Sequence, residues 1–353
     1  MPIVAEHYTF VIGVDTHAAS HSLALVVAST GAVIDQSVFA NTPAALDRAL
    51  TWIVHRIDGQ SSLIVIEGVG SYGAGLADRV TARGLTVAEP SAMPAAQRRG
   101  VGKTDALDAV RIARSVLAVD TSRLRWPRAT GPRVVLRVLV VAHEQMVAER
   151  TRSINALTAL LRTIDLGLDM RKALSHSQFK VIAGWRDRRE DSVVRTCRQE
   201  AIRLAKRIVA LDGELLDNRK ALDAAVADTV PKLCELPGVG SVVAASVLTA
   251  WSHPGRVRSE AAFAALAGTC PIPASSGNTL RYRLNRGGDR RLNRALTTVV
   301  IVRMRTHAPT KAYVARRRAE GRTTKEIMRS LKRYITRQLY RTLAATHPVA
   351  ATP

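Results

Sequence analysis

The order of apolar runs in the first ninety residues constrains the fold of this chain more than any other feature. Short β-rich runs separated by turns predict an antiparallel meander of three strands over 9–15, 22–28 and 31–39. A helix opened by Asn41 and Pro43 is expected next, followed by a strand, a second helix and a last strand. These four elements cover 42–57, 62–67, 74–83 and 85–89.

A meander followed by helix, strand, helix and strand is the order of an RNase H-like (RuvC-like) α/β domain. Acidic residues occupy the places where such a sheet would hold a metal site. Asp15 ends the first expected strand and Glu67 ends the fourth. Asp105 and Asp108 are spaced i, i+3 in the first turn of a helix expected from Thr104, so their carboxylates point from one face.

Four converging carboxylates would repel one another unless cations neutralised them. Two Mg²⁺ (or Mn²⁺) ions about 4 Å apart would do so, and would clamp the attacking and leaving oxygens of an in-line phosphoryl transfer. The sequence therefore predicts that Asp15, Glu67, Asp105 and Asp108 are metal ligands and catalytic residues. The alternative is that each is a solvated residue, because acids are favoured in the first turn of any helix.

Other polar residues in this part of the chain carry weaker signals. The glycines of 68–75 lack the Lys-Ser/Thr ending of a nucleotide-binding loop and predict a turn that passes close to the acids. His17, His21 and His143 have no partner at metal-ligand spacing. Each is expected to be a surface histidine or a hydrogen-bonded one.

The formal net charge of +23 predicts a polyanionic partner, with a generally basic proteome as the alternative. The charge is unevenly distributed. Residues 1–90 contain four Lys or Arg against eight Asp or Glu, whereas residues 281–341 contain nineteen against three. The C-terminal part is therefore expected to contact nucleic-acid phosphates.

The residues expected to contact nucleic acid lie in a linker, in a basic segment and in a glycine turn. The basic ones are Arg98, Arg99, Lys103, Arg281, Arg283, Arg286, Arg290, Arg291 and Arg294. Residues 233–248 have the form of a helix-hairpin-helix turn, in which Gly238 and Gly240 would let backbone N–H groups face a DNA phosphate. An ordinary glycine-broken helical turn is the alternative.

Long helical periodicity lies between these regions, over 134–165 and 190–227. Apolar residues in the second stretch alternate by three and four positions, as in a coiled coil. Two such helices around a break predict a helical hairpin. Three domains are expected, covering 1–125 (RuvC-like), 126–228 (coiled-coil hairpin) and 229–353 (mainly helical, with the basic tail).

Composition argues against several other classes of protein. Cys197, Cys234 and Cys270 are too far apart in the sequence for a zinc site and too few for a disulfide framework. No signal peptide is recognisable, and no apolar stretch reaches the ~18 residues of a membrane span. A cytoplasmic, nucleoid-associated protein is expected.

Ser275 and Ser276 lie beside Gly277 in a polar loop flanked by arginines. A Ser-Ser-Gly stretch is ordinarily a flexible turn. A nucleophilic serine would need activation, and the arginines could stabilise a phosphate under attack. Considered alone, these residues leave both interpretations open.

Several short motifs follow one another in a specific order. They are Val-Ile-Gly-Val-Asp15, Val-Ile-Glu67-Gly, Lys103-Thr-Asp105-Ala-Leu-Asp108-Ala, Leu-Pro-Gly-Val-Gly at 236–240, Ser-Ser-Gly at 275–277 and Asn-Arg-Gly-Gly-Asp-Arg-Arg-Leu-Asn-Arg at 285–294. The first three resemble the DEDD motifs of the IS110 family of insertion-sequence transposases, and the others resemble its C-terminal transposase domain. The resemblance covers nearly the whole chain.

This resemblance implies a transposase or site-specific recombinase similar to Piv-type DNA invertases. Its partners would be double-stranded target and donor DNA, which several family members pair with a structured noncoding bridge RNA. It implies a serine that forms a 5′-phosphoserine link, for which Ser276 matches best and Ser275 is the rival. It also implies homodimers that assemble into a tetramer, with an active site shared by two protomers.

Two other functions stay open. A metal-dependent Holliday-junction-type nuclease would use the same four acids and never bond to DNA. A non-catalytic nucleic-acid-binding protein would keep the acids for structural reasons only.

Overall fold

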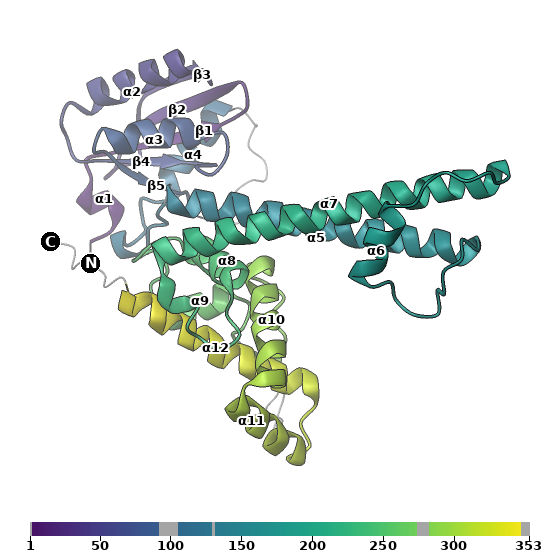
Figure 1. Cartoon of the computed structure of the whole chain (residues 1–353). Coiled ribbons are helices and arrows are strands. Elements are labelled where there is room, and N and C mark those ends of the chain that lie inside the picture. Colours follow the sequence, from purple (N-terminus) through teal and green to yellow (C-terminus); the bar gives the residue numbers. More distant parts are fainter. Residues whose placement is uncertain (1, 92–104, 129–130, 274–281, 347–353) are drawn as a thin grey trace. The chain divides into compact units, whose positions relative to one another are not determined.

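A computed structural model describes residues 2–91, 105–128, 131–273 and 282–346 (Figure 1). Its contacts divide the chain into two compact units, Met1–Arg128 and Ala129–Pro353. Several residues singled out in the sequence lie outside the described ranges: Arg98, Arg99, Lys103, Ser275, Ser276 and Arg281.

The first unit is built on a five-stranded sheet in the order β3-β2-β1-β4-β5. β1 pairs antiparallel with β2, and β2 with β3, whereas β4 is parallel to β1 and β5 is parallel to β4. A meander extended by two parallel strands is consistent with the predicted RNase H-like α/β class. The strands are β1 Phe10–Thr16, β2 Ser20–Val27, β3 Val33–Ala40, β4 Ser62–Ile66 and β5 Thr86–Ala88.

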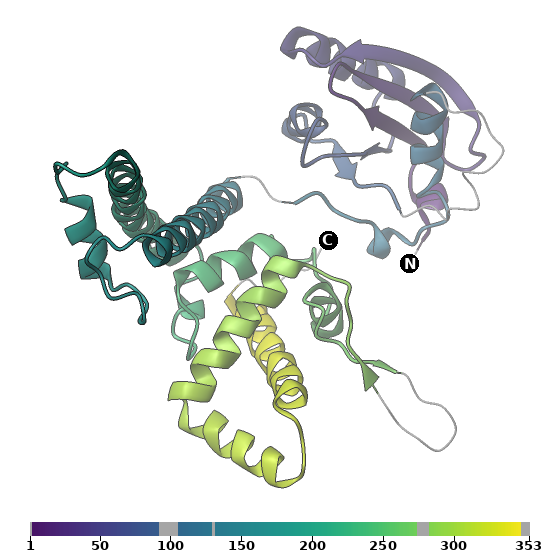
Figure 2. The same cartoon turned by 90° about the vertical axis from the view of Figure 1, so that its right-hand side faces the viewer.

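Different helices cover the two faces of this sheet (Figure 2). α2 (Pro43–Ile57) and α3 (Ala74–Ala82) pack on the face that receives Ile12 and Val14 of β1. α4 (Asp105–Arg114) and the short α1 (Val4–His7) pack on the other face. α2 begins with Pro43 after Thr42 as its N-cap, one residue later than the Asn41 cap expected from the sequence.

Side-chain alternation in β1 places the acidic residue on the α4 face. Successive residues of a strand point to opposite faces. Ile12 and Val14 enter the α2–α3 core, while Val11 enters the core beneath α4. Asp15 shares its parity with Val11 and therefore lies on the face that α4 covers.

The second unit begins with a long helical hairpin. α5 (Pro132–Thr163) and α7 (Ser192–Thr229) run side by side, and α6 (His176–Ala183) packs on them near the tip (Figure 1). Apolar residues of all three helices form one core, including Leu157, Phe179 and Ile208. Only a break between the two long helices was predicted where α6 lies, because an eight-residue helix carries too little periodicity to be recognised.

The rest of the second unit is a helical bundle with a small two-stranded ribbon. α8 is buried over nearly its whole surface at the centre of its core. The elements are η3 Pro231–Leu233, α8 Ser241–Trp251, α9 Glu260–Leu266, β6 Ile272–Pro273, β7 Tyr282–Arg283, α10 Arg290–Thr306, α11 Ala308–Ala319 and α12 Thr324–Thr346.

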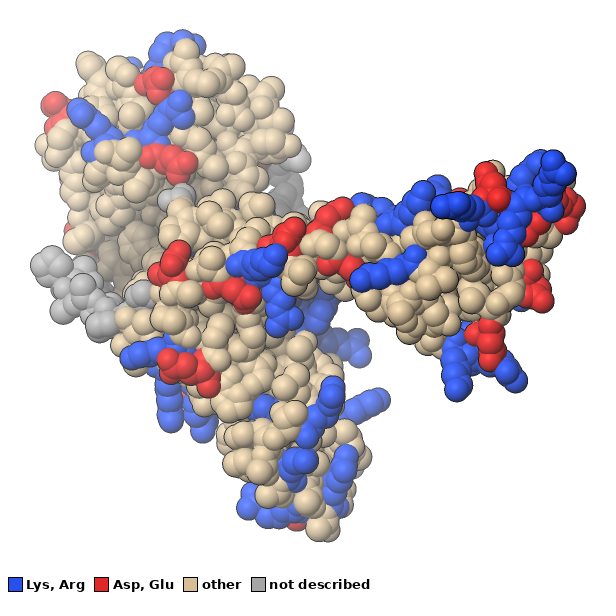
Figure 3. Space-filling view, viewed as in Figure 1, with Lys and Arg blue, Asp and Glu red and all other residues tan. Residues whose placement is uncertain are grey.

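Lys and Arg side chains gather over the α10–α12 region and again near the tip of the hairpin (Figure 3). No helix in the described ranges is both long enough and apolar enough to cross a membrane.

Candidate functional site

The acidic residues of β1 and α4 meet through a histidine. Nε2 of His17 lies 3.1 Å from Oδ2 of Asp15 and 3.6 Å from Oδ1 of Asp105. One ligand atom of each of these three residues lies within 4.8 Å of the other two. Asp15 is 6% exposed, whereas the other two side chains are open to solvent.

The surroundings of Asp15 disfavour the ionised form of its carboxylate, because too little positive charge lies nearby to stabilise it. Burial raises the pKa of Asp15, and the nearby carboxylates of Asp108 and Asp105 raise it further. His17 lowers that pKa by charge and by its hydrogen bond, but the net shift is upward. A cation at this place would therefore stabilise the ionised form of Asp15.

Asp108 and Glu67 relate to this cluster in different ways. Asp108 is near enough to act on Asp15 electrostatically, while its Oδ1 accepts a 2.8 Å hydrogen bond from Nη1 of Arg111. Glu67 follows β4, and its backbone N–H donates to the carbonyl of Val14, beside Asp15. Its side chain is exposed and is outside the Asp15, His17 and Asp105 group.

The donor atoms fit a hard divalent cation. Carboxylate oxygens are the preferred ligands of Mg²⁺ and Mn²⁺, and Mn²⁺ also accepts imidazole. The buried Asp15 with its raised pKa, and an exposed acid directed at the same histidine, leave negative charge to be neutralised. Asp15 and Asp105 could hold such an ion, with Asp108 and Glu67 on adjoining elements.

His17 is an exposed, hydrogen-bonded histidine, as the sequence predicted, whereas the prediction for His21 was wrong. His17 has a partner two residues away, because a strand end and the turn after it bring Asp15 and His17 together. His21 is fully buried on β2, and neither ring nitrogen makes a hydrogen bond of acceptable geometry with a described residue. Burial lowers the pKa of His21, which favours the neutral ring. His143 is hydrogen-bonded to Asn218 over 3.2 Å, as expected for a satisfied histidine.

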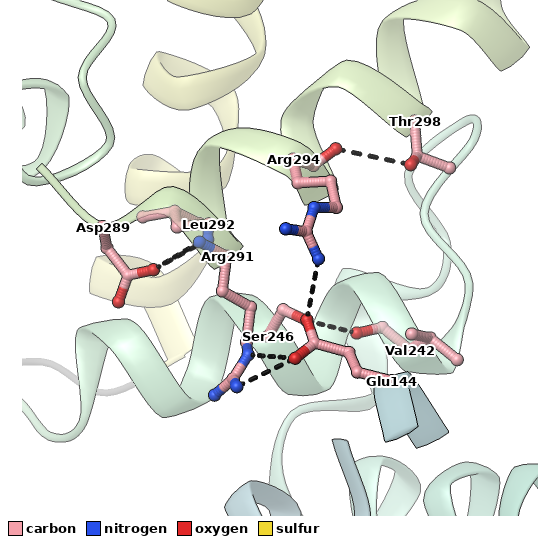
Figure 4. A network of polar contacts seen from close by, with 8 residues as sticks. All are labelled: Glu144, Val242, Ser246, Asp289, Arg291, Leu292, Arg294 and Thr298. Carbon is pink, nitrogen blue, oxygen red and sulfur yellow. Dashed lines mark hydrogen bonds and ion pairs between the residues drawn. The ribbon is translucent and has the colours of Figure 1, made fainter. Parts of the chain in front are cut away.

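The basic segment of the second unit divides into exposed and paired arginines. Arg283, Arg286 and Arg290 are exposed. Arg291, by contrast, donates from Nε and Nη2 to Oε2 of Glu144 on α5, at 3.0 and 2.9 Å (Figure 4). Arg294 also points toward that carboxylate, at 3.5 Å, but stays mostly exposed.

A buried arginine of α10 donates a hydrogen bond to the backbone of the glycine turn before α8. Gly238 has a φ of +77°, a left-handed conformation that favours glycine. Arg303 of α10 donates from Nε to the carbonyl of Pro237 over 2.7 Å and from Nη1 to Oε1 of Gln338 on α12. The turn therefore has a fixed backbone, although contact of Gly238 and Gly240 with DNA remains a prediction.

Two family models match the chain over the parts that hold these features. The model described as the DEDD transposase of the IS110 type matches residues 12–165. The model for the transposase IS116/IS110/IS902 family matches residues 230–315. The chain belongs to the IS110 family of transposases.

Two curated relatives are proteins of insertion elements. The insertion element IS900 uncharacterized 42 kDa protein of Mycobacterium paratuberculosis is 28% identical, over 99% of this chain and 96% of the relative. The insertion element IS110 uncharacterized 43.6 kDa protein of Streptomyces coelicolor is 26% identical, over 66% of this chain and 69% of the relative. Membership in a transposase family implies that the chain binds DNA and takes part in cutting and rejoining it.

Proposed function

We propose that this IS110-family chain cuts and rejoins DNA with a serine nucleophile and a divalent-metal site formed by Asp15, Glu67, Asp105 and Asp108. The observation that carries the proposal is the convergence of the buried Asp15 and the α4 acid Asp105 on His17, on the sheet face that α4 covers. Such convergence is costly unless it serves a cation.

The acidic residues of the first unit would hold the metal ion and neutralise its charge. Asp15 and Asp105 supply oxygen ligands, and the exposed Glu67 supplies a further carboxylate at the next strand end. A bound Mg²⁺ or Mn²⁺ would polarise the phosphodiester and stabilise the charge of the leaving oxygen. Nε2 of His17 lies near a carboxylate oxygen of each of the two acids and keeps them in place.

The residues of the second unit would bind the strand and supply the nucleophile. Ser276, with Ser275 as the rival, is the candidate that attacks phosphorus and displaces a 3′-oxygen, forming a 5′-phosphoserine link. The exposed Arg283, Arg286 and Arg290 follow the serines closely in the chain and could neutralise phosphate oxygens. These serine and arginine roles rest on the family resemblance and on exposure.

The proposed partners are target and donor DNA and a structured noncoding RNA that pairs with both. The net charge of +23, concentrated in the second unit, supports a polyanionic partner. The RNA and the assembly of homodimers into a tetramer rest on the family resemblance alone. The guide RNA is tested by expressing the chain together with its own flanking DNA and identifying the RNA that copurifies with it. No enrichment of flank transcripts would contradict it.

A covalent adduct tests the serine mechanism most directly. A labelled junction substrate carrying the element ends is incubated with the chain and its RNA, denatured and resolved for protein-linked DNA. The wild type is expected to give an adduct whose phosphorylated residue is identified by mass spectrometry after nuclease digestion. Ser276→Ala is expected to abolish the adduct and Ser275→Ala to retain it.

The same assay separates the competing functions. An adduct that persists in the Ser275→Ala, Ser276→Ala double variant would overturn the serine mechanism. Free cut ends with no adduct, dependent on Asp15, would indicate a metal-dependent nuclease. DNA binding without cutting, unchanged in Asp15→Asn, would indicate a binding protein.

A further inference from the structure

A cavity of about 960 Å³ lies in the second unit between the β6–β7 ribbon and helix α12. Cys270 and Pro271 line it just before β6, and Arg283 and Leu284 line it at and after β7. Residues of α12, among them Lys332, line the opposite side. Figure 2 shows the ribbon and α12 that border this space.

The wall of the cavity is strongly cationic. Among the described residues, seven Lys or Arg side chains line it against one acid, Glu326. Four of the seven have carboxylate partners within 4 Å: Arg317, Arg322, Arg333 and Arg337. Arg283, Arg329 and Lys332 form no ion pair within 4 Å with any residue in the described part of the chain, although the charge of Arg329 acts on Glu326. A cavity with this excess of positive charge attracts an anion.

Lys332 is the most informative of these three cations. It is half-buried, and its Nζ donates to the neutral amide oxygen of Asn293 over 2.8 Å. Burial lowers the pKa of Lys332, because no negative charge compensates the lost hydration. An ammonium group held by an amide at a cavity wall is placed to bind a phosphate oxygen.

The cavity also has an aromatic wall. Tyr334 lines it with 53% of its surface exposed, an unusual exposure for an aromatic side chain. Its ring meets that of Tyr313 edge-on, with centroids 5.9 Å apart and planes at 84°. The contact orients Tyr334 while leaving it accessible. Cationic grooves with exposed aromatic rings are typical of proteins that bind single-stranded nucleic acid, whose bases stack on the rings.

The volume favours a short single strand over a duplex. Pockets of about 300–1,000 Å³ hold one drug-sized molecule. A space of this size can therefore take a few unpaired nucleotides and is too small to enclose a double helix. The two strands of the ribbon beside the cavity, β6 and β7, directly precede and follow residues 274–281 in the sequence. Ser275 and Ser276 belong to that segment.

We infer that this cavity binds a short unpaired stretch of DNA, with phosphates on Arg283, Arg329 and Lys332 and a base stacked on Tyr334. The inference rests on the proposed function, since strand cutting is what supplies an unpaired DNA end beside the serine segment. It adds residues of α12 that the sequence analysis did not assign to nucleic acid.

Equilibrium binding without cutting tests this site. The full chain is titrated, without divalent metal, against a fluorescent duplex that either is blunt or carries an unpaired extension of about six nucleotides. Tyr334→Leu is expected to weaken binding of the extended duplex about 5- to 100-fold, the usual cost of losing one stacked base. Tyr334→Phe keeps the ring and is expected to bind as the wild type does. Binding of the blunt duplex should be unchanged in both variants.

The lysine is tested with a matched control on the same helix. Lys332→Gln is expected to reduce the slope of log K against log salt by about 0.7, the share of one phosphate of a single strand. Lys325→Gln removes the same charge from an exposed α12 residue outside the cavity and should leave the extension-specific slope unchanged.

The outcomes separate this inference from the proposed function. A wild type that binds neither duplex would contradict the proposed function itself. A wild type that prefers the extension, with Tyr334→Leu and Lys332→Gln both indistinguishable from it, would overturn the cavity alone. Tighter binding of an RNA extension than of a DNA extension would also overturn it, because the cavity would then be a binding site for RNA and not for DNA.

Discussion

Gly13 of β1 lies directly against the backbone of Ala109 of α4. A methyl group on Gly13 would overlap the carbonyl oxygen of Ala109 and would come within 2.5 Å of the amide nitrogen of Ala113. Only glycine allows this approach of helix to strand. Since Asp15 follows Gly13 by two residues and Asp105 precedes Ala109 by four, the contact determines how closely the acids approach one another.

Gly13→Ala is therefore expected to push α4 away from β1 and to separate Asp105 from Asp15. Overpacking of this kind costs about 1–3 kcal/mol of unfolding free energy. We expect a loss of that size in chemical denaturation, together with a loss of DNA cutting. Gly213→Ala is the matched control, because nothing lies within 4 Å of a methyl group there. In the interior of α7 it should stabilise by up to about 1 kcal/mol. Equal stability of Gly13→Ala and the wild type would contradict the packing argument.

Glu144 neutralises Arg291, a residue predicted from the sequence to contact nucleic acid. Glu144→Gln is expected to free Arg291 and Arg294 for phosphates. Duplex DNA binding should then tighten at low salt, and the slope of log K against log salt should steepen by up to about 0.9 for each new contact. Glu149→Gln removes the same charge from α5, where the partner is Arg207 within the hairpin. A similar change in both variants would mean that only net charge matters.

Glu260 joins α9 to α12 through three arginines, Arg333, Arg337 and Arg341. A hydrogen bond from Arg337 and the positive charges around it hold the pKa of Glu260 below its ordinary value. A depressed carboxyl pKa stabilises the fold above the unfolded pKa, about 4.3, and this contribution is lost as pH falls through the folded value.

Glu260→Gln should accordingly lower the melting temperature near pH 7, and its difference from the wild type should shrink as pH falls below about 4. Glu235→Gln is the control, since Glu235 is exposed and forms no ion pair in the described part of the chain. A difference that stays constant from neutral to acid pH would show that the ion pairs contribute nothing to stability.

Periodic features could be predicted from the sequence, and contacts between distant residues could not. Short apolar runs bounded by turns indicated every strand of the first unit, and Asp15 lies near the end of the first strand, as expected. The ion pair of Glu144 with Arg291 joins residues 147 positions apart, and no local sequence pattern predicts such a pair. The contact of His17 with Asp15 was not predicted, because the ligand spacings typical of zinc sites do not include an acid and a histidine two residues apart. A histidine two residues beyond an acid at a strand end is a signal that could have found it.

The cavity beside α12 was missed for a related reason. Lys332 and Tyr334 belong to a helix that shows only a basic amphipathic pattern in sequence. Their importance depends on the cavity that α12 lines together with the ribbon, and on which of its arginines pair with acids. Burial and pairing are properties of the folded chain, so composition alone treats all nineteen cations of 281–341 as equivalent.

We propose that Asp15 serves a divalent cation that DNA cutting requires. This role is tested by the rate at which the full chain, with its RNA, cuts a junction substrate over a Mg²⁺ titration. Asp15→Asn is expected to reduce that rate by about a hundredfold or more. Asp35→Asn, which alters an acid paired with Arg56 over 2.6 Å, should not reduce it. Undiminished cutting by Asp15→Asn, or cutting by the wild type in excess chelator, would contradict the account.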